Sequence, residues 1–455
     1  MMTTSKRVLI ALLSTLALHQ TAFAAVSEQE AQHLKTDLTP LGAERAGNAD
    51  GSIPAWDGGY TQSAPGDERG GRRSDPFSDE KPLFTINAQN MGQYADQLTP
   101  GTQALLEKYP DTFYLDVYET HRTAAAPQWV YDNTYENATR GTLDGTVPQN
   151  VFGGIPFPIP QSGAEVMWNH QLRWRGGDLE HADNWYQVLS DGRRVLISDA
   201  AVDEQVPYYF KDSNLESFTD DNSPFWKVLI KNMGPPIRAG QALLAHEYLD
   251  QDDTQTWVYL TGQRRVRRLP NACCDTPQPA SAGAMTFDEL YVWTGRLDRF
   301  DWSIVGKQEM YIPYNTNGFM QPKSDDEVLE KHHWNPDYMR WEKHRVWVVE
   351  ATLKDGERHQ APRSRYYCDE DTWICVLGDR WDANGELWKV LWTATFVAPE
   401  LPGVSMGAFG LYDLVDGSAF FAHIVNEKDK QFHYLEEPRS PITFSPDSMA
   451  GNSFR

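Results

Sequence analysis

The chain has 455 residues and a formal net charge of −23, from 64 acidic and 41 basic residues. This acid excess argues against nucleic acid as a partner and against broad adhesion to anionic membranes. The 16 tryptophans, 20 tyrosines and 19 phenylalanines exclude a disordered chain and favour strands, because aromatic side chains pack well on a half-buried pleated surface.

The first 24 residues have the pattern of a secretory signal. Lys6 and Arg7 precede an apolar run from Val8 to Leu18, and Ala22-Phe23-Ala24 is the small-x-small pattern that signal peptidase cleaves. The run of about eleven residues is shorter than the roughly twenty that span a bilayer, and no later segment approaches that length. We therefore expect export to the periplasm, removal of residues 1–24 and a soluble mature protein with no transmembrane segment.

Residues 25–110 are expected to form an N-terminal arm with short helices. Ser27 and Glu30 have the spacing of a capping box, and a helical pattern at 88–106 is interrupted by Pro100-Gly101. Between these two patterns the chain is rich in Gly, Pro, Asp and Ser, which indicates an extended segment. Its expected anchors are Ile53, Trp56 and Tyr60.

Residues 111–455 are expected to form the main domain. Helices are predicted at 162–174, which Ser162 and Glu165 would cap, and at 326–342. The proline-rich segment 152–160 is predicted to be a loop with exposed Phe152, Ile155 and Phe157. Alternation at period two predicts strands at 113–140 (a meander), 185–198 (a hairpin turning at Asp191-Gly192), 225–233, 242–249, 310–314, 345–353, 365–368, 373–377, 386–396, 420–426 and 432–435.

Strands at this spacing, with few long helical periods, predict a mainly β (α+β) fold built on a large antiparallel sheet. A twisted sheet of that size tends to curl. The helices are expected to lie on one of its faces.

The segment 256–270 combines a clear strand pattern with a dense basic cluster. It predicts a hairpin or one long bent strand, with Trp257 and Tyr259 on one face. One interpretation of its arginines is a solvated edge strand protected by charge. The other is a cationic rim that binds an anionic headgroup, because guanidinium groups match phosphate and carboxylate. The four residues are Arg264, Arg265, Arg267 and Arg268.

Five motifs resemble a bacterial family of unknown function whose members are often labelled outer-membrane lipoprotein-sorting proteins, and which is similar to the periplasmic carriers of the Lol system. The motifs are G-x-I-P-A-W-D-G-G at 51–59, W-V-Y-L with R-R-V-R-R-L in 257–269, F-D-E-L-Y-V-W-T-G-R-L-D-R-F-D-W-S-I-V-G-K at 287–307, H-R-V-W-V-V-E-A-T-L at 344–353 and Y-Y-C-D-E-D-T-W-I-C-V-L-G-D-R-W-D-A-N-G-E-L-W-K at 366–389. The resemblance implies a half-barrel with helices across its concave face. It also implies a possible partnership with an inner-membrane exporter of the resistance-nodulation-division class.

The predicted function is a periplasmic carrier or chaperone for a hydrophobic or amphiphilic, lipid-like molecule, working without covalent chemistry or a cofactor. Trp257, Tyr259, Trp293 and Trp347 are the candidates for the cavity wall, and the four arginines for its rim. A filled core without a cavity is the alternative, since apolar faces are more often packed than hollow. Carbohydrate binding is the rival function, because exposed aromatic rings also stack on sugars.

Four cysteines in an exported chain are expected to be oxidised. A tight turn at Asp371-Thr372 would place Cys368 opposite Cys375, so these two are the predicted disulfide. The adjacent Cys273 and Cys274 are left as a strained vicinal bond, as free thiols or as a contact to another chain.

Catalytic patterns are weak. Ser405 lies in a G-x-S-x-G sequence, but Pro399 and Pro402 separate it from the preceding strand, and a glycine-rich turn is the preferred interpretation. His332-His333 lack the i, i+4 spacing of a helical zinc site. We therefore predict neither an enzyme nor a metal site, with a serine hydrolase as a remote alternative.

The mature protein is expected to begin at Ala25 without an acyl chain, because no cysteine follows the cleavage site. Removal of Lys6 and Arg7 with the signal would make the net charge −25, since residues 1–24 contain no acid. Intact-mass measurement of exported protein checks this. A mass larger by a diacylglyceryl group, or retention of residues 1–24, would contradict it.

Overall fold

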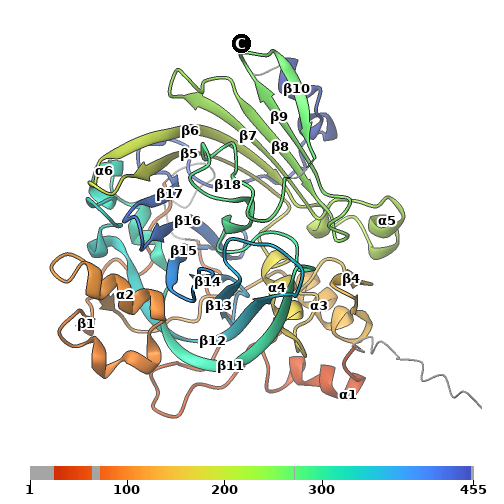
Figure 1. The fold of residues 1–455 in the computed structure, drawn as a ribbon. Coiled ribbons are helices and arrows are strands. Elements are labelled where there is room, and N and C mark those ends of the chain that lie inside the picture. Colours follow the sequence, from red (N-terminus) through yellow and green to blue (C-terminus); the bar gives the residue numbers. More distant parts are fainter. Residues whose placement is uncertain (1–24, 64–71, 271, 452–455) are drawn as a thin grey trace, which may run out of the picture.

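A computed structural model describes residues 25–63, 72–270 and 272–451, and the predicted signal lies outside these residues. A 16-stranded sheet dominates the fold, in the order β1-β2-β12-β13-β14-β15-β16-β17-β5-β6-β7-β8-β9-β10, with β11 beside β12 and β18 beside β5 (Figure 1). The strands of this sheet are β1 Phe84–Ile86, β2 Leu115–Val117, β5 Asp178–Val188, β6 Arg194–Gln205, β7 Trp226–Gly234, β8 Ala242–Glu247, β9 Gln255–Leu260, β10 Arg265–Leu269, β11 Phe300–Pro313, β12 Arg340–Leu353, β13 Arg363–Asp369, β14 Cys375–Trp381, β15 Leu387–Ala398, β16 Gly403–Asp413, β17 Ala419–Ile424 and β18 His433–Tyr434.

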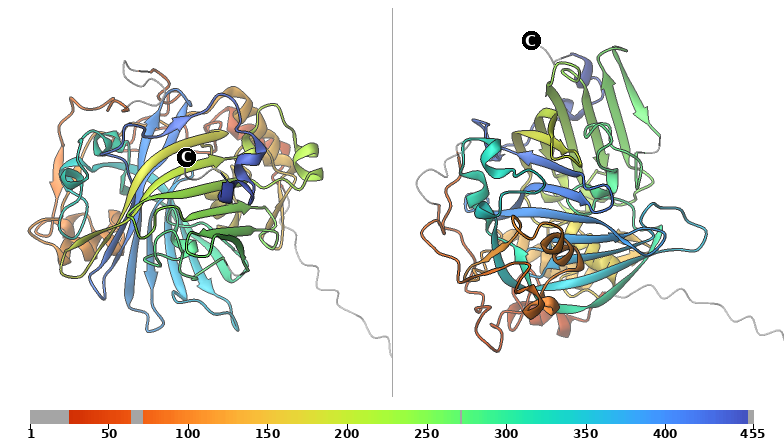
Figure 2. Two further views of the ribbon diagram at one scale, coloured as in Figure 1. Left: turned by 90° about the horizontal axis from the view of Figure 1, so that it is seen from above. Right: turned by 60° about the vertical axis from the view of Figure 1, so that its left-hand side comes forward.

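The sheet is mixed, strongly curved and open. The pairing of β2 with β12 is parallel, whereas the other neighbouring strands are antiparallel. The curl is visible from two directions in Figure 2. In the part of the chain that the structure describes, β10 and β11 each pair with one neighbour and not with each other, so the sheet does not close into a barrel. A separate hairpin joins β3, Thr142–Asp144, to β4, Val147–Gln149.

The helices are short: α1 Glu28–Ala31, α2 Pro100–Lys108, α3 Gln128–Arg140, α4 Gly163–Gln171, α5 Leu215–Asp220, α6 Asp325–Val328 and α7 Ser448–Gly451. In the residues described, none is long and apolar enough to cross a membrane.

Helices lie on both faces of the sheet, so the prediction that they share one face is wrong. Gly101 of α2 packs against Asp379, whereas Val292 packs against Gly378. Consecutive residues of a strand point to opposite faces, which places α2 and the loop around Val292 on opposite sides of β14. His170 of α4 bonds to the carbonyls on both sides of Val292, so α4 lies with that loop.

Two predicted elements are corrected. The second half of the meander predicted at 113–140 is the helix α3, because its buried residues Val130, Thr134, Asn137 and Ala138 recur with a helical period and not with period two. The helix predicted at 326–342 is wrong. There α6 ends at Val328, Pro336 begins a separate turn, and β12 starts at Arg340.

Three smaller predictions also change. Phe152, Ile155 and Phe157 lie in a loop, as expected, but all three are buried rather than exposed. Ser405 lies within β16, not in a turn. Pro100 begins α2 rather than breaking a longer helix, since the first helical turn needs no N–H donor there.

The locally coded features are confirmed. Ser27 and Glu30 form the capping box of α1, and the Ser162 side chain caps α4. Gly192, at φ +83°, lies in the β5–β6 hairpin turn. The predicted disulfide joins Cys368, near the end of β13, to Cys375, the first residue of β14, and so closes the turn of this hairpin.

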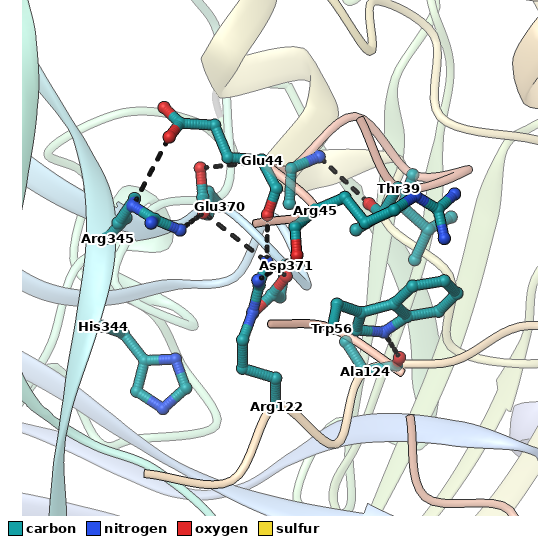
Figure 3. Close-up of polar contacts among 12 residues, drawn as sticks. Thr39, Glu44, Arg45, Trp56, Arg122, Ala124, His344, Arg345, Glu370 and Asp371 are labelled. Carbon is teal, nitrogen blue, oxygen red and sulfur yellow. Dashed lines mark hydrogen bonds and ion pairs between the residues drawn. The ribbon is translucent and has the colours of Figure 1, made fainter. Parts of the chain in front are cut away.

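The N-terminal arm is fixed to this disulfide-closed turn by a buried arginine (Figure 3). Arg122 donates to both carboxylate oxygens of Asp371, at 2.9 and 2.6 Å, and to the carbonyl of Glu44 at 2.7 Å. The expected anchors Ile53 and Trp56 hold the arm beside it. Ile53 is buried, and the Trp56 indole donates to the carbonyl of Ala124 at 2.9 Å.

We expect Arg122→Ala to lower the free energy of unfolding by about 3–5 kcal/mol, because it leaves the buried Asp371 carboxylate without its cation. The matched control is Arg193→Ala, which removes an exposed surface pair with Asp191 worth no more than about 1 kcal/mol. Urea denaturation of both variants measures the difference. Equal losses would contradict the role assigned to Arg122.

Candidate ligand-binding site

The four aromatic residues predicted for the cavity wall are not brought together. Trp257 and Tyr259 pack with Leu229, Leu244 and Phe444 under the C-terminal segment, on the face of β9 opposite Val258, which belongs to the main core. The alternation correctly placed the two rings on one face, but that face is covered by the C-terminal segment.

Trp293 and Trp347 lie elsewhere. Trp293 is buried in a loop, with Trp302 and Tyr366 at ring-centre distances of 5.1 and 5.6 Å. Trp347 is half-buried beside Trp373. Both therefore contribute to packing, and neither lines the two pockets described below.

The predicted cationic rim is an exposed edge. Arg265, Arg267 and Arg268 lie on the terminal strand β10, and Arg264 lies in the turn before it at φ +50°. All four side chains are exposed, and no ion pair to them is found within the described ranges. This arrangement fits the interpretation of an edge strand protected by charge.

A pocket of about 630 Å³ opens at another place, and segments far apart in sequence build it. Its apolar wall combines residues from α3, the segment after α4, the segment after β6, the β15–β16 turn and the chain around β18. These residues are Trp129, Trp174, Tyr209, Phe210, Leu401, Tyr434 and Leu435.

Three of these rings form a fixed aromatic corner. Trp129 meets Trp174 edge to face at 5.6 Å, and Trp174 meets Tyr209 at 5.0 Å. The Trp174 indole donates to the carbonyl of Pro402 at 2.8 Å, and the Tyr209 hydroxyl donates to the carbonyl of Leu172 at 2.5 Å. Because these hydrogen bonds fix their rings, the apolar surface of the corner is preformed.

The polar lining is substantial and consists of Asp178, Lys211, Asp212, Ser213, Ser217, Glu400 and Glu436. Some of these groups are engaged. Glu400 is paired with Arg73. Asp178 accepts the backbone N–H of Arg439 at 3.0 Å, and its burial raises the pKa of its carboxyl to about 6. Lys211 and Asp212 are exposed. Aromatic rings with a few carboxylates at the rim suit an amphiphile and also suit a sugar.

Close behind this pocket lies a buried cluster of His181, Asp183, Glu204 and His423. His181 Nδ1 is 2.6 Å from Asp183 and its Nε2 is 3.4 Å from Glu204. Burial opposes the protonation of His181, but these two carboxylates outweigh it and raise its pKa to about 9. Burial lowers the pKa of His423 to about 4, so this ring is neutral.

This cluster has the residue types of a metal site, but an imidazolium already neutralises it. A divalent ion beside His181 would add positive charge where Arg175 lies 4.0 Å from Glu204. The similar group of His344, Asp369 and Asp371 is likewise occupied, because Asp371 is paired with Arg122. Neither group fits a cation well.

The vicinal cysteines line a second pocket, of about 410 Å³. Both are free thiols, which is one of the alternatives that the sequence left open. A hydrogen bond with Cys274 lowers the pKa of the Cys273 thiol to about 7.

Ser405 lacks a histidine partner among the residues that the structure describes. It is buried in β16. The arrangement of Ser405 therefore does not support the hydrolase alternative.

The raised pKa of His181 leads us to expect a specific dependence of the stability on pH. Its pKa is higher in the folded protein than the ordinary 6.5, so its contribution is complete below pH 6.5 and is lost as the pH rises to about 9. We expect wild type to lose about 3 kcal/mol of unfolding free energy over this window relative to His181→Gln. Urea titrations at several pH values measure this.

The control is His33→Gln, which removes an exposed histidine paired with Asp37 and should keep the wild-type slope. The same slope in wild type and His181→Gln would show that His181 is neutral.

Comparison with known proteins shows which family this chain belongs to. An uncharacterized protein of Pseudomonas aeruginosa is 39% identical over 449 residues, which is 95% of each chain. A putative outer membrane lipoprotein-sorting protein domain from Vibrio parahaemolyticus aligns with 63% of this chain and 98% of its own, at 12% identity and a TM-score of 0.44. A DUF1329 family protein from Desulfovibrio piger aligns with 61% of this chain and 93% of its own, at 16% identity and a TM-score of 0.40.

Residues 85–450 match the model of a family described as protein of unknown function, DUF1329. The resemblance to a family of unknown function is thereby confirmed, and this chain belongs to the DUF1329 family.

Proposed function

We propose that this protein binds a hydrophobic or amphiphilic molecule in the aromatic pocket and acts as a carrier or chaperone in the periplasm. The observation that carries the proposal is the preformed corner of Trp129, Trp174 and Tyr209 in an open pocket of about 630 Å³. Ligand pockets commonly have volumes of about 300–1,000 Å³ and an apolar wall with few polar groups.

The pocket supplies an energetic reason for such binding. Each methylene buried against the wall contributes about 0.8 kcal/mol, so a chain of about ten carbons offsets the cost of association. The polar groups that line the pocket then orient the molecule.

The ligand site proposed here replaces the one predicted from the sequence. Trp257 and Tyr259 are on the face under the C-terminal segment, and the exposed arginines of β10 lie on an edge strand. The secretory signal and the exporter partnership remain predictions from the sequence and from the resemblance.

Carbohydrate binding is the second candidate, because Asp178 and Glu400 line the same pocket beside the aromatic rings. Sugars need such hydrogen-bond acceptors, whereas an acyl chain does not. The two candidates therefore differ in what saturates the pocket.

The test is titration with fluorescent acyl probes of increasing chain length. Affinity should rise about fourfold per added methylene until the pocket is filled. Trp129→Ala should weaken binding about tenfold or more, because it removes one side of the corner. Trp257→Ala is the matched control and should bind like wild type.

Unchanged binding by Trp129→Ala would remove the aromatic pocket from the proposal. Saturable binding of an oligosaccharide without any acyl binding would favour the carbohydrate candidate.

A further inference from the structure

Two buried arginines flank the tryptophan of the aromatic corner. Arg173 and Arg175 are only 4% and 9% exposed. Trp174, between them, lines the large pocket, whereas both arginines line a small cavity of about 20 Å³. A space of this size holds about one water molecule or one oxygen atom of a larger group.

Arg173 has no anionic partner among the described residues. In the residues that the structure describes, its one hydrogen bond runs from Nη1 to the carbonyl of His170, at 2.6 Å. Its guanidinium also lies 5.7 Å from the centre of the Tyr291 ring. No carboxylate of the described chain lies within ion-pair distance of Arg173. A fully buried guanidinium is thus left with a carbonyl and a ring face.

Arg175 is only weakly paired. Its closest carboxylate oxygen, on Glu204, is 4.0 Å from Nη1, and its Nε has no hydrogen-bond partner. Glu204 is already engaged, because it accepts from the Trp226 indole at 2.7 Å and faces His181 at 3.4 Å. Glu204 is therefore a weak partner for Arg175.

The pairing of the charges in this cluster supports this description. Arg173, Arg175 and the protonated His181 share this region with three carboxylates, Asp178, Asp183 and Glu204, but Asp183 and Glu204 are engaged by His181 and no ion pair joins Asp178 to either arginine in the described residues. A buried cation without a partner costs several kcal/mol. Consistent with that cost, burial and the charge of Arg175 lower the pKa of Arg173 to about 9.

We infer that Arg173 and Arg175 bind the carboxylate or phosphate headgroup of the amphiphile whose chain occupies the aromatic pocket. The inference rests on the proposed function, and it names the ligand class as anionic. Asp178 lines both cavities, so the headgroup would meet the arginines beside this side chain, with one oxygen in the small cavity. Burial raises the pKa of Asp178 to about 6, so binding of the anion would be accompanied by protonation of this carboxyl. Guanidinium groups match both headgroups through paired N–H donors.

The experiment compares ligands that differ only in the headgroup. Binding of dodecanoate, dodecyl phosphate and dodecanol to the full mature protein is measured by displacement of a fluorescent acyl probe. Wild type should bind the two anions at least tenfold more tightly than dodecanol. Arg173→Met and Arg175→Met should lose this preference and bind dodecanol like wild type.

Two further variants separate charge from folding. Arg173→Lys keeps the charge and should retain part of the preference, while Arg265→Met removes an exposed arginine and should retain all of it. Equal affinity of wild type for dodecanoate and dodecanol would overturn the inference while leaving the proposed function intact. Equal loss of anionic and neutral binding in Arg173→Met and Arg175→Met would also overturn it, since both arginines would then support only the fold.

Inorganic phosphate and acetate, added without any acyl chain, test whether the arginines bind a free anion rather than the headgroup of an amphiphile. Under the inference, neither should raise the Tm of wild type at concentrations where dodecanoate or dodecyl phosphate does. A rise with phosphate alone that is absent in Arg173→Met, without binding of any dodecyl ligand, would replace the amphiphile with a free anion and contradict the proposed function.

Discussion

The interior of this protein depends on the imidazole of His170, which joins three elements. Its Nδ1 accepts the backbone N–H of Cys375 at 3.0 Å, and its Nε2 faces the carbonyls of Tyr291 and Trp293 at 3.1 and 3.0 Å. Burial lowers the pKa of His170 well below its ordinary value, so the ring is neutral, with one nitrogen accepting and the other donating. All nine residues of α4 are buried, and this one side chain connects the helix to β14 and to the loop around Val292.

The position of the aromatic pocket follows from this arrangement. The chain leaves α4 directly into Arg173, Trp174 and Arg175, so the helix fixes the side chains that line both cavities. The opposite wall comes from the β15–β16 turn and from the chain around β18, which the sheet holds in place. The pocket is thus a consequence of where α4 is held, and not of any single strand.

Buried charge is the second organising feature of the fold. Most buried cations are neutralised locally, as Arg122 is by Asp371 and Arg380 by Asp288. Such pairs contribute little net free energy, but breaking one is costly because the remaining charge stays buried. Arg173 departs from this rule, because no carboxylate of the described residues lies within ion-pair distance of its guanidinium.

The sequence by itself determined what depends on near neighbours. The caps at Ser27 and Ser162, the hairpin at Asp191-Gly192 and the Cys368–Cys375 pairing all involve residues close in the chain, so local patterns predicted them. Period-two alternation also put Trp257 and Tyr259 on one face, and the motifs correctly indicated the family.

Only the tertiary structure decided which faces are covered and which stay open. Alternation says which residues share a face, but the C-terminal segment that covers Trp257 lies about two hundred residues away in sequence. The pocket joins Trp129, Trp174, Tyr209 and Tyr434, and no spacing in the sequence relates these four. A site made by long-range packing leaves no local pattern, whereas a turn or a cap does.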